Sequence, residues 1–260
     1  LFNESIIIDY LSSLMKIITL LAAFVVLLIS SNYLRTFEIF KIEYPILILS
    51  SVLGMMIMIS SNDLIVFYMG LELQSLALYV LATFNRDQLK SSEAGLKYFV
   101  LSALSSGLLL YGCSLIYGFT GSTNFNVIST QFNTNEYAIT FGIVFILVGL
   151  AFKISAVPFH MWAPDVYEGS PTSVTLFFTM VPKIAALTVF IRFLYVPFLN
   201  LIDQWQMILV FLSIASMLFG AIAAIGQKNL KRLIAYSSIS HIGYALAGLA
   251  TGSNLSLIHI

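Results

Sequence analysis

The stretch Gly149-Leu-Ala-Phe-Lys-Ile-Ser-Ala-Val-Pro158 ends a long apolar run on a lysine and follows it with small residues and a proline. This pattern predicts a helix that breaks near the lysine, because proline has no backbone N–H to donate to a helix. Transporters use broken helices to place polar backbone at membrane depth. A discontinuous helix near Lys153–Pro158 is therefore the feature from which we predict the fold.

The composition around this stretch is that of a membrane protein. The chain is 59% hydrophobic and 9% charged, with a mean hydropathy of +0.96, whereas a soluble domain is roughly 25% charged. The net charge is zero and no basic block occurs, which argues against nucleic-acid binding. The single cysteine, Cys113, cannot form an internal disulfide or hold an iron–sulfur cluster, and no dinucleotide or P-loop spacing occurs. We expect a chain that is solvated by lipid and carries no cofactor of its own.

Apolar runs of about 17–25 residues predict about eight transmembrane helices. The predicted spans are Ser13–Tyr33, Pro45–Ser60, Leu64–Thr83, Glu93–Phe119, Tyr137–Val157, Pro171–Val196, Gln206–Gly226 and Arg232–Gly252. A short polar turn, Ser61-Asn62-Asp63, separates the second span from the third.

The basic residues test this division into spans. If the spans alternate in direction, one set of connections contains Arg35, Lys41, Arg86, Lys90, Lys228, Lys231 and Arg232. The opposite connections, Thr120–Glu136 and Pro197–Trp205, contain neither Lys nor Arg. Short loops rich in Lys and Arg stay in the cytoplasm. We therefore predict that the basic connections are cytoplasmic and that Leu1 lies on the outer side.

Three charged residues lie well inside the predicted spans: Glu72, Lys153 and Lys183. A charge in the hydrocarbon costs at least about 2.5–3.5 kcal/mol, so each of the three is a candidate functional residue. Glu72 lies on a helix face whose other members are polar: Tyr68, Ser75, Tyr79 and Thr83. This stripe indicates a hydrated interior path. The alternative is a glutamate that only pairs with a lysine to hold two helices together.

Lys183 follows Pro182 in the centre of its span, on one helix face with three threonines, Thr172, Thr175 and Thr179. Proline removes a backbone donor and kinks the helix, which can free carbonyls for water. Loss of water favours the neutral amine, so a buried lysine can exchange its proton where an exposed one cannot. The alternative is a static counter-ion for Glu72 or another acid.

The stretch after the predicted break, Phe159–Pro171, mixes aromatic residues, prolines and two acids. Its simplest interpretation is a surface loop, but its aromatic residues favour a packed, ordered connection. His160 is a weaker candidate than Lys153 for proton transfer.

Four other ionisable residues lie nearer the span ends. Lys97 follows Glu93 by four residues, which predicts an i,i+4 ion pair of structural character. His241 shares a face with a serine and a tyrosine and is either a proton relay or a hydrogen-bonded core histidine. Lys16 and Arg192 are expected to extend to the membrane interface.

Several stretches resemble one known family. Phe152-Lys-Ile-Ser-Ala-Val-Pro-Phe-His-Met-Trp-Ala-Pro-Asp-Val-Tyr-Glu-Gly-Ser-Pro-Thr172 resembles the signature of the subunit N (subunit 2) family of proton-translocating NADH:quinone oxidoreductase, respiratory complex I. Leu71-Glu-Leu-Gln-Ser75, Pro182-Lys-Ile-Ala185 and the stretch 227–244 are similar to the same family in the same order. The resemblance extends up to about Gly252.

The resemblance implies an all-α, polytopic, antiporter-like helix bundle. It implies that Glu72 is the glutamate beside the channel lysine, Lys153 the central proton-carrying lysine of the broken helix, and Lys183 the connecting lysine. Lys97 and His241 also match family positions and become secondary candidates for proton translocation.

The same resemblance implies where the redox chemistry and the partners lie. NADH, flavin, iron–sulfur clusters and quinone would be bound by partner subunits, so this chain would not be redox-active by itself. Its partners would be other membrane subunits of complex I, especially neighbouring antiporter-like subunits, and the lipid bilayer. Both a bacterial plasma (inner) membrane and a mitochondrial inner membrane fit such a multi-pass chain.

The resemblance also implies a domain organisation in which residues 1–260 are a fragment that forms a single transmembrane antiporter-like domain. Residues 45–196 would be the first five-helix repeat and 206–252 the start of a second. Leu255–Ile260 is also what a sequencing adapter encodes on translation, so we expect an artefact there and assign no function to His259.

Two other classes stay open at this point. A cation/proton antiporter or membrane-hydrogenase subunit would carry similar buried charges, although the run from Pro158 to Gly169 is more typical of the respiratory family. A structural membrane scaffold would use the charges only to pack helices. Three deep charges with polar stripes argue against a scaffold.

Overall fold

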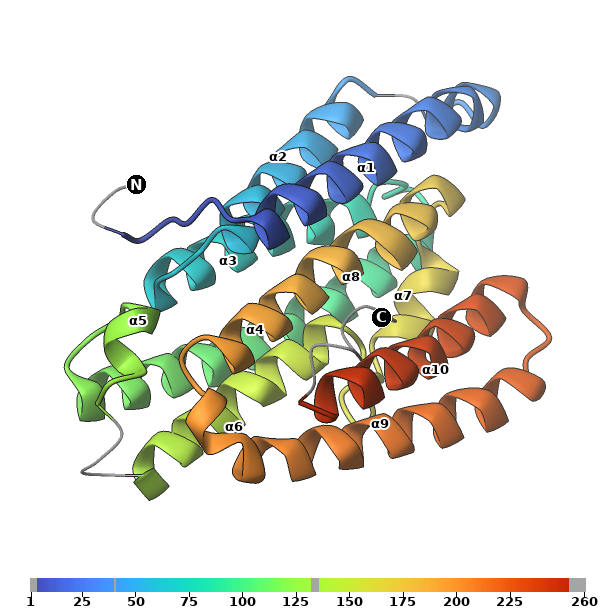
Figure 1. Cartoon of the computed structure of the whole chain (residues 1–260). Coiled ribbons are helices and arrows are strands. Elements are labelled where there is room, and N and C mark those ends of the chain that lie inside the picture. Colours follow the sequence, from blue (N-terminus) through green and yellow to red (C-terminus); the bar gives the residue numbers. More distant parts are fainter. Residues whose placement is uncertain (1–3, 40, 132–135, 253–260) are drawn as a thin grey trace. The chain divides into compact units, whose positions relative to one another are not determined.

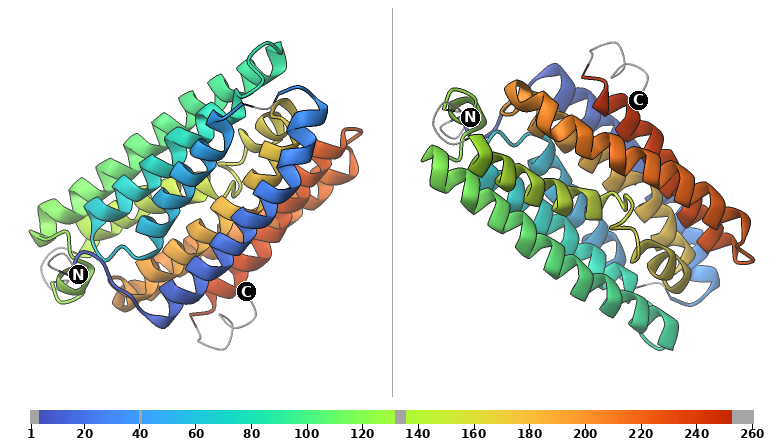
Figure 2. Two further views of the ribbon diagram at one scale, coloured as in Figure 1. Left: turned by 90° about the horizontal axis from the view of Figure 1, so that it is seen from above. Right: turned by 90° about the horizontal axis from the view of Figure 1, so that it is seen from below.

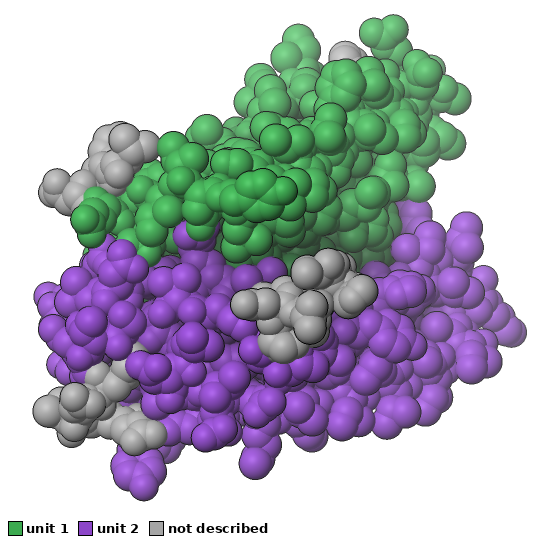
Figure 3. Space-filling view, viewed as in Figure 1, with its two compact units in different colours: residues 1–101, 165–189 green, residues 102–164, 190–260 purple. Residues whose placement is uncertain are grey.

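The computed structural model describes residues 4–39, 41–131 and 136–252, which form α-helices and one short 3-10 helix, with no strand longer than an isolated bridge. The chain divides into two compact units, shown in Figure 3. Unit 1 consists of Leu1–Leu101 and Asp165–Val189, and unit 2 of Ser102–Pro164 and Phe190–Ile260. Leu255–Ile260, where the sequence predicts an artefact, lies outside the described residues.

Unit 1 contains the first three helices and parts of three others. These are α1 (Tyr10–Thr36), α2 (Glu43–Ile59), α3 (Leu64–Ala82), the first part of α4 (Leu89–Thr120), most of α7 (Ala163–Gly169) and most of α8 (Thr172–Tyr195). Helices α2 and α3 lie side by side (Figures 1 and 2). The turn between them is the predicted polar one, where Asp63 caps α3 by accepting hydrogen bonds from the backbone N–H of Ile65 (2.8 Å) and of Val66 (3.3 Å).

Unit 2 contains the rest of α4 and the later helices. These are α5 (Phe125–Ile128), α6 (Glu136–Lys153), η1 (Leu199–Leu201), α9 (Ile202–Ile225) and α10 (Leu230–Ala250). Helices α9 and α10 form a hairpin whose arms lie side by side in Figures 1 and 2. Buried polar contacts hold the arms together, among them the 2.7 Å hydrogen bond from Ser213 Oγ to the Gly243 carbonyl.

All eight predicted spans correspond to observed helices, namely α1–α4, α6 and α8–α10. Six apolar helices in the described part of the chain are long enough to cross a membrane, while α2 and Tyr137–Lys153 are shorter apolar helices. Helix α6 ends at Lys153, four residues before the predicted end at Val157. The short helices α5 and α7 were not predicted.

The outward faces of the long helices are apolar. On α1, Ile17, Leu21, Phe24 and Leu28 are all more than half exposed and follow steps of four, three and four. A stripe of exposed apolar side chains at helical spacing would be unfavourable in water and suits contact with hydrocarbon.

Helices α4 and α6 approach at backbone distance in unit 2. A Cβ atom added at Gly112 would lie 2.7 Å from the Gly142 carbonyl oxygen and 2.9 Å from the Ile146 backbone nitrogen. Small residues permit such close packing in membrane proteins, where apolar side chains gain little by leaving lipid. The glycine pair therefore fixes how the two helices are aligned.

Replacing Gly112 by alanine should push α4 away from α6 and destabilise the protein by about 1–3 kcal/mol, as overpacking does. Thermal unfolding of the detergent-solubilised full-length protein would measure this. Gly107→Ala on the same helix is the matched control, because a Cβ there meets nothing within 4 Å. Equal unfolding temperatures for the two variants would show that the glycine contact does not set the packing.

Candidate functional site

The predicted helix break is present, and it begins directly after Lys153. The Ala156 backbone N–H donates to the Ala151 carbonyl at 2.9 Å and that of Ser155 to the Phe152 carbonyl at 3.0 Å. Together with the positive φ of 61° at Ser155, these bonds form a Schellman ending. Glycine usually occupies this position, since a left-handed conformation costs a residue with a side chain roughly 1–2 kcal/mol. Lys153 thus lies in the last turn of α6, where the helix dipole favours a positive charge.

Polar groups freed by the break find partners inside unit 2. The Trp162 indole N–H donates to the Phe152 carbonyl at 2.9 Å, and the Trp162 ring stacks on the Phe152 ring. The Val157 backbone N–H donates to Ser216 Oγ of α9, also at 2.9 Å. His160 rests against Phe219, with ring centroids 4.5 Å apart. The segment is therefore a packed connection, as its aromatic residues suggested, and not a loose loop.

The Lys153 side chain points into the protein. Its residue surface is 9% exposed, and its Nζ donates a 2.7 Å hydrogen bond to Ser102 Oγ on α4, a residue that is fully buried. A buried ammonium needs such partners, because removal from water disfavours the charged form.

Lys183 lies beside Tyr167, which also binds the backbone carbonyl that Pro182 leaves without a donor. Proline at this position removes the hydrogen bond that the Phe178 carbonyl, one turn earlier, would otherwise accept. The Tyr167 hydroxyl of α7 donates to that carbonyl instead, at 3.3 Å. Lys183 Nζ lies 5.8 Å from the centroid of the same tyrosine ring, within range of a cation–π contact, and the lysine is 6% exposed.

Glu72 lies on the inward face of α3. Its Oε1 atom is buried and accepts no hydrogen bond from any described residue. The other members of its polar stripe are buried or partly buried, whereas Met69 and Leu76, three residues before and four residues after Glu72, are more than half exposed. The polar stripe therefore faces the protein, and Glu72 lies at its edge. Tyr79 of the stripe packs edge-on against Tyr98 of α4, with centroids 5.0 Å apart.

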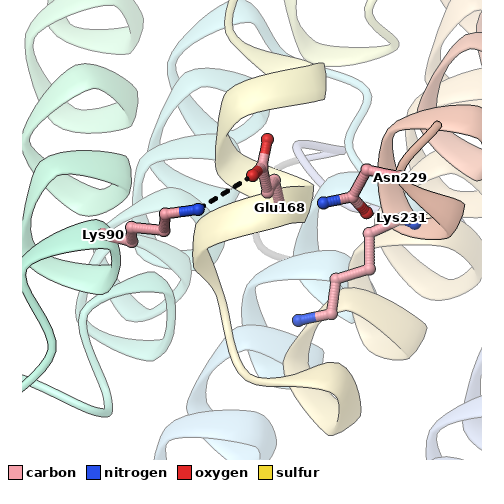
Figure 4. Close-up of polar contacts among 4 residues, drawn as sticks. All are labelled: Lys90, Glu168, Asn229 and Lys231. Carbon is pink, nitrogen blue, oxygen red and sulfur yellow. Dashed lines mark hydrogen bonds and ion pairs between the residues drawn. The ribbon is translucent and has the colours of Figure 1, made fainter. Parts of the chain in front are cut away.

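Lys97 lies in a charged cleft of unit 1 with a volume of about 140 Å³. Its Nζ contacts Glu93 at 2.9 Å, the predicted i,i+4 pair, and also Asp165 of α7 at 3.0 Å. A second ion pair, Lys90–Glu168 at 3.2 Å, lines the same cleft and is drawn in Figure 4. Two ion pairs thus tie α7 to α4, although their partly exposed side chains make them weak contributors to stability.

His241 is exposed, whereas Arg192 is buried. His241 is exposed on α10 beside Tyr244, with centroids 6.2 Å apart, so it is not a core histidine within this chain. The same helix begins at Asn229, whose side chain accepts from the Lys231 backbone N–H at 2.9 Å; both residues are labelled in Figure 4.

Arg192 was expected to extend to the interface, but it is only 4% exposed and lies inside the protein.

The predicted site residues divide between the units. Glu72, Lys97 and Lys183 belong to unit 1, and Lys153 and His241 to unit 2. The expectation that Glu72 lies beside Lys153 stays a prediction, because it joins different units. Sequence reasoning missed Ser102, Tyr167 and Asp165 as partners of the lysines, since each lies far along the chain from its lysine or gives no local signal.

No three His, Cys, Asp or Glu side chains come together as a metal site within residues 4–39, 41–131 and 136–252. Cys113 is buried in α4 and is not part of a disulfide in the described part of the chain. The side chains described above present amines, carboxylates and hydroxyl groups.

A broken apolar helix with a buried lysine at its end, inside a polytopic bundle, defines the class of antiporter-like membrane proteins. The chain belongs to the NADH:quinone oxidoreductase/Mrp antiporter transmembrane family, whose family model matches residues 61–260.

Individual relatives agree with the resemblance seen in the sequence. NADH-quinone oxidoreductase subunit N of Pelagibacter ubique is 80% identical over 98% of this chain and 54% of its own length. A structure of respiratory complex I from Thermus thermophilus matches 95% of this chain and 52% of its counterpart at 36% identity, with a TM-score of 0.78. An Mrp complex from Dietzia matches 94% of this chain and 46% of its counterpart at 26% identity, with a TM-score of 0.84. The chain spans about half the length of the curated relatives it matches.

Replacing Tyr167 by phenylalanine should lower the thermal stability of the protein. The Phe178 carbonyl would lose its donor while the ring beneath Lys183 stays, a loss of about 1 kcal/mol for so long a hydrogen bond. Tyr117→Phe is the matched control, because that tyrosine is 53% exposed. If both variants unfold at the parent temperature in detergent, the Tyr167 hydroxyl does not stabilise the fold.

Proposed function

We propose that this chain is the antiporter-like part of a proton-translocating subunit N of NADH:quinone oxidoreductase. The observation that carries the proposal is the buried Lys153 side chain at the end of a broken helix, whose Nζ lies 2.7 Å from the Ser102 hydroxyl oxygen. An ionisable group at membrane depth is costly and is kept for function by default. The 80% identical relative is named NADH-quinone oxidoreductase subunit N, which supports this choice of complex.

Within this function each charged residue has a distinct role. Lys153 is the central proton carrier, because the break gives its amine polar surroundings without exposing it. Lys183 is the connecting carrier, and Glu72 supplies the negative charge that decides whether the lysines hold their protons. Unit charges about 6 Å apart at an effective dielectric of about 20 interact by about 2.8 kcal/mol, which suffices to load or release a proton. Lys97 at the charged cleft and His241 have secondary roles.

The redox chemistry belongs to other subunits. NADH, flavin, iron–sulfur clusters and quinone would bind to partners, and electron transfer there would drive proton movement here at a distance. The partners in the membrane would be neighbouring antiporter-like subunits, which the exposed apolar faces of the long helices could contact along with lipid. The bacterial relatives support location in a bacterial plasma membrane.

We also infer that residues 45–196 form the first five-helix repeat of this subunit and that residues 206–252 start the second. The first interval contains the broken helix and both buried lysines, which supports its treatment as a transport module.

A cation/proton antiporter is the second candidate, and the likeness to an Mrp complex favours it. The two functions differ in what drives them. Proton movement that depends on NADH supports the respiratory function, whereas movement that depends on a sodium gradient without NADH supports the antiporter.

The test is NADH-driven proton uptake by membrane vesicles that carry the full-length subunit with Lys153→Ala or Lys183→Ala. Both substitutions should leave assembly and NADH–ferricyanide activity intact, while quinone-linked turnover and pumping fall at least about tenfold, as expected when a proton carrier is removed. Lys228→Ala, an exposed lysine on a basic connection, is the control and should pump at the parent rate. Parent-level pumping per electron in both lysine variants would favour a scaffold in which the charges only pack helices.

A further inference from the structure

The alignment of α4 against α6 brings one serine to the proton-carrying lysine. The two helices run antiparallel, so successive contacts advance along α6 as they go back along α4. Gly112 meets Gly142, and Leu109, three residues earlier on α4, meets Gly149, seven residues later on α6. Ser102, a further seven residues back on α4, meets Lys153, four residues after Gly149. The backbone contact at the glycines thus sets the register that places a hydroxyl at the lysine.

We infer that Ser102 is a positioning residue that holds the Lys153 amine in both of its protonation states. This inference rests on the proposed function of Lys153. Ser102 itself neither gives up nor gains a proton in the transport step.

The chemistry of a hydroxyl group suits this task. When Lys153 is an ammonium, its Nζ donates to Ser102 Oγ, which is the contact observed at 2.7 Å. After the ammonium has lost a proton to the next acceptor, the neutral amine has a free lone pair, and the same hydroxyl can rotate and donate its hydrogen to that lone pair. A carbonyl could accept from the amine in either form, but it has no hydrogen to donate to the lone pair of the neutral amine. A serine hydroxyl therefore keeps the amine in place while its charge changes.

Neighbouring serines on α4 show that this role is specific to one position. Ser105 Oγ donates to the Gly149 carbonyl at 3.4 Å, which is a contact between helices that does not involve the lysine. Ser106 Oγ is buried and has no hydrogen-bond partner among the described residues. All three serines are at most 4% exposed, so burial alone does not distinguish them. Ser106 is therefore a matched control for Ser102.

The experiment compares Ser102→Ala, Ser106→Ala, Ser102→Thr and Lys153→Ala in the full-length subunit within the intact complex. Proton uptake driven by NADH is measured in vesicles, with assembly and NADH–ferricyanide activity recorded for each variant. Ser102→Ala should lower the pumping rate about tenfold, the change that a net hydrogen bond to a charged group supplies. Ser106→Ala should pump at the parent rate. Ser102→Thr should restore most of the lost rate, because it retains the hydroxyl.

Two results would overturn the inference while leaving the proposed function in place. In one, Lys153→Ala stops pumping but Ser102→Ala pumps at the parent rate. In the other, Ser102→Ala and Ser106→Ala lose equal activity, since the loss of any buried hydroxyl on α4 would then explain the effect. Parent-level pumping by Lys153→Ala would instead overturn the proposed function itself.

A Ser102→Ala protein that does not assemble would be replaced by Ser102→Cys, which keeps the size of the side chain but has only a weakly accepting sulfur. Reduced pumping by this variant supports the inference, and parent-level pumping contradicts it.

Discussion

The absence of water in the hydrocarbon region constrains this structure more than any other factor. A helix that stops inside a membrane leaves carbonyl and N–H groups that lipid cannot satisfy, and each would cost several kcal/mol unpaired. The break after Lys153 is possible because the protein supplies the partners: two backbone bonds of the Schellman ending, the Trp162 indole and the Ser216 hydroxyl. Those bonds in turn fix the position of the Lys153 backbone, from which the side chain extends.

In both units a buried lysine contacts a polar or aromatic group of another helix, but the group differs. Ser102 contacts Lys153 through a hydroxyl, and Tyr167 offers Lys183 the face of its ring. In each unit the compensating residue lies on a different helix from the lysine. The lysine therefore has this partner only when the two helices are packed as in the folded protein. A buried lysine costs free energy to remove from water, but its need for one particular partner favours one particular packing of the helices.

The sequence predicted the helices and the break well, because apolar length, proline and small residues act locally. The Asp63 cap region and the Glu93–Lys97 pair were predictable for the same reason. The second partner of Lys97, Asp165, and the burial of Arg192 were not, because they depend on which helix faces pack together. Ser102 looked like any other small residue in an apolar span, and only the alignment of α4 with α6 distinguishes it from Ser105 and Ser106.

The glycine contact between α4 and α6 also bears on how the protein responds to its bilayer. Membranes differ by several ångströms in hydrocarbon thickness, and single helices adjust by tilting. Helices joined backbone to backbone at Gly112 and Gly142 must tilt as a pair, because sliding one past the other would bring their backbones into collision. The distance between the Ser102 hydroxyl and the Lys153 amine is thereby insulated from hydrophobic mismatch, so changes in lipid composition should reorient the pair without altering its internal geometry.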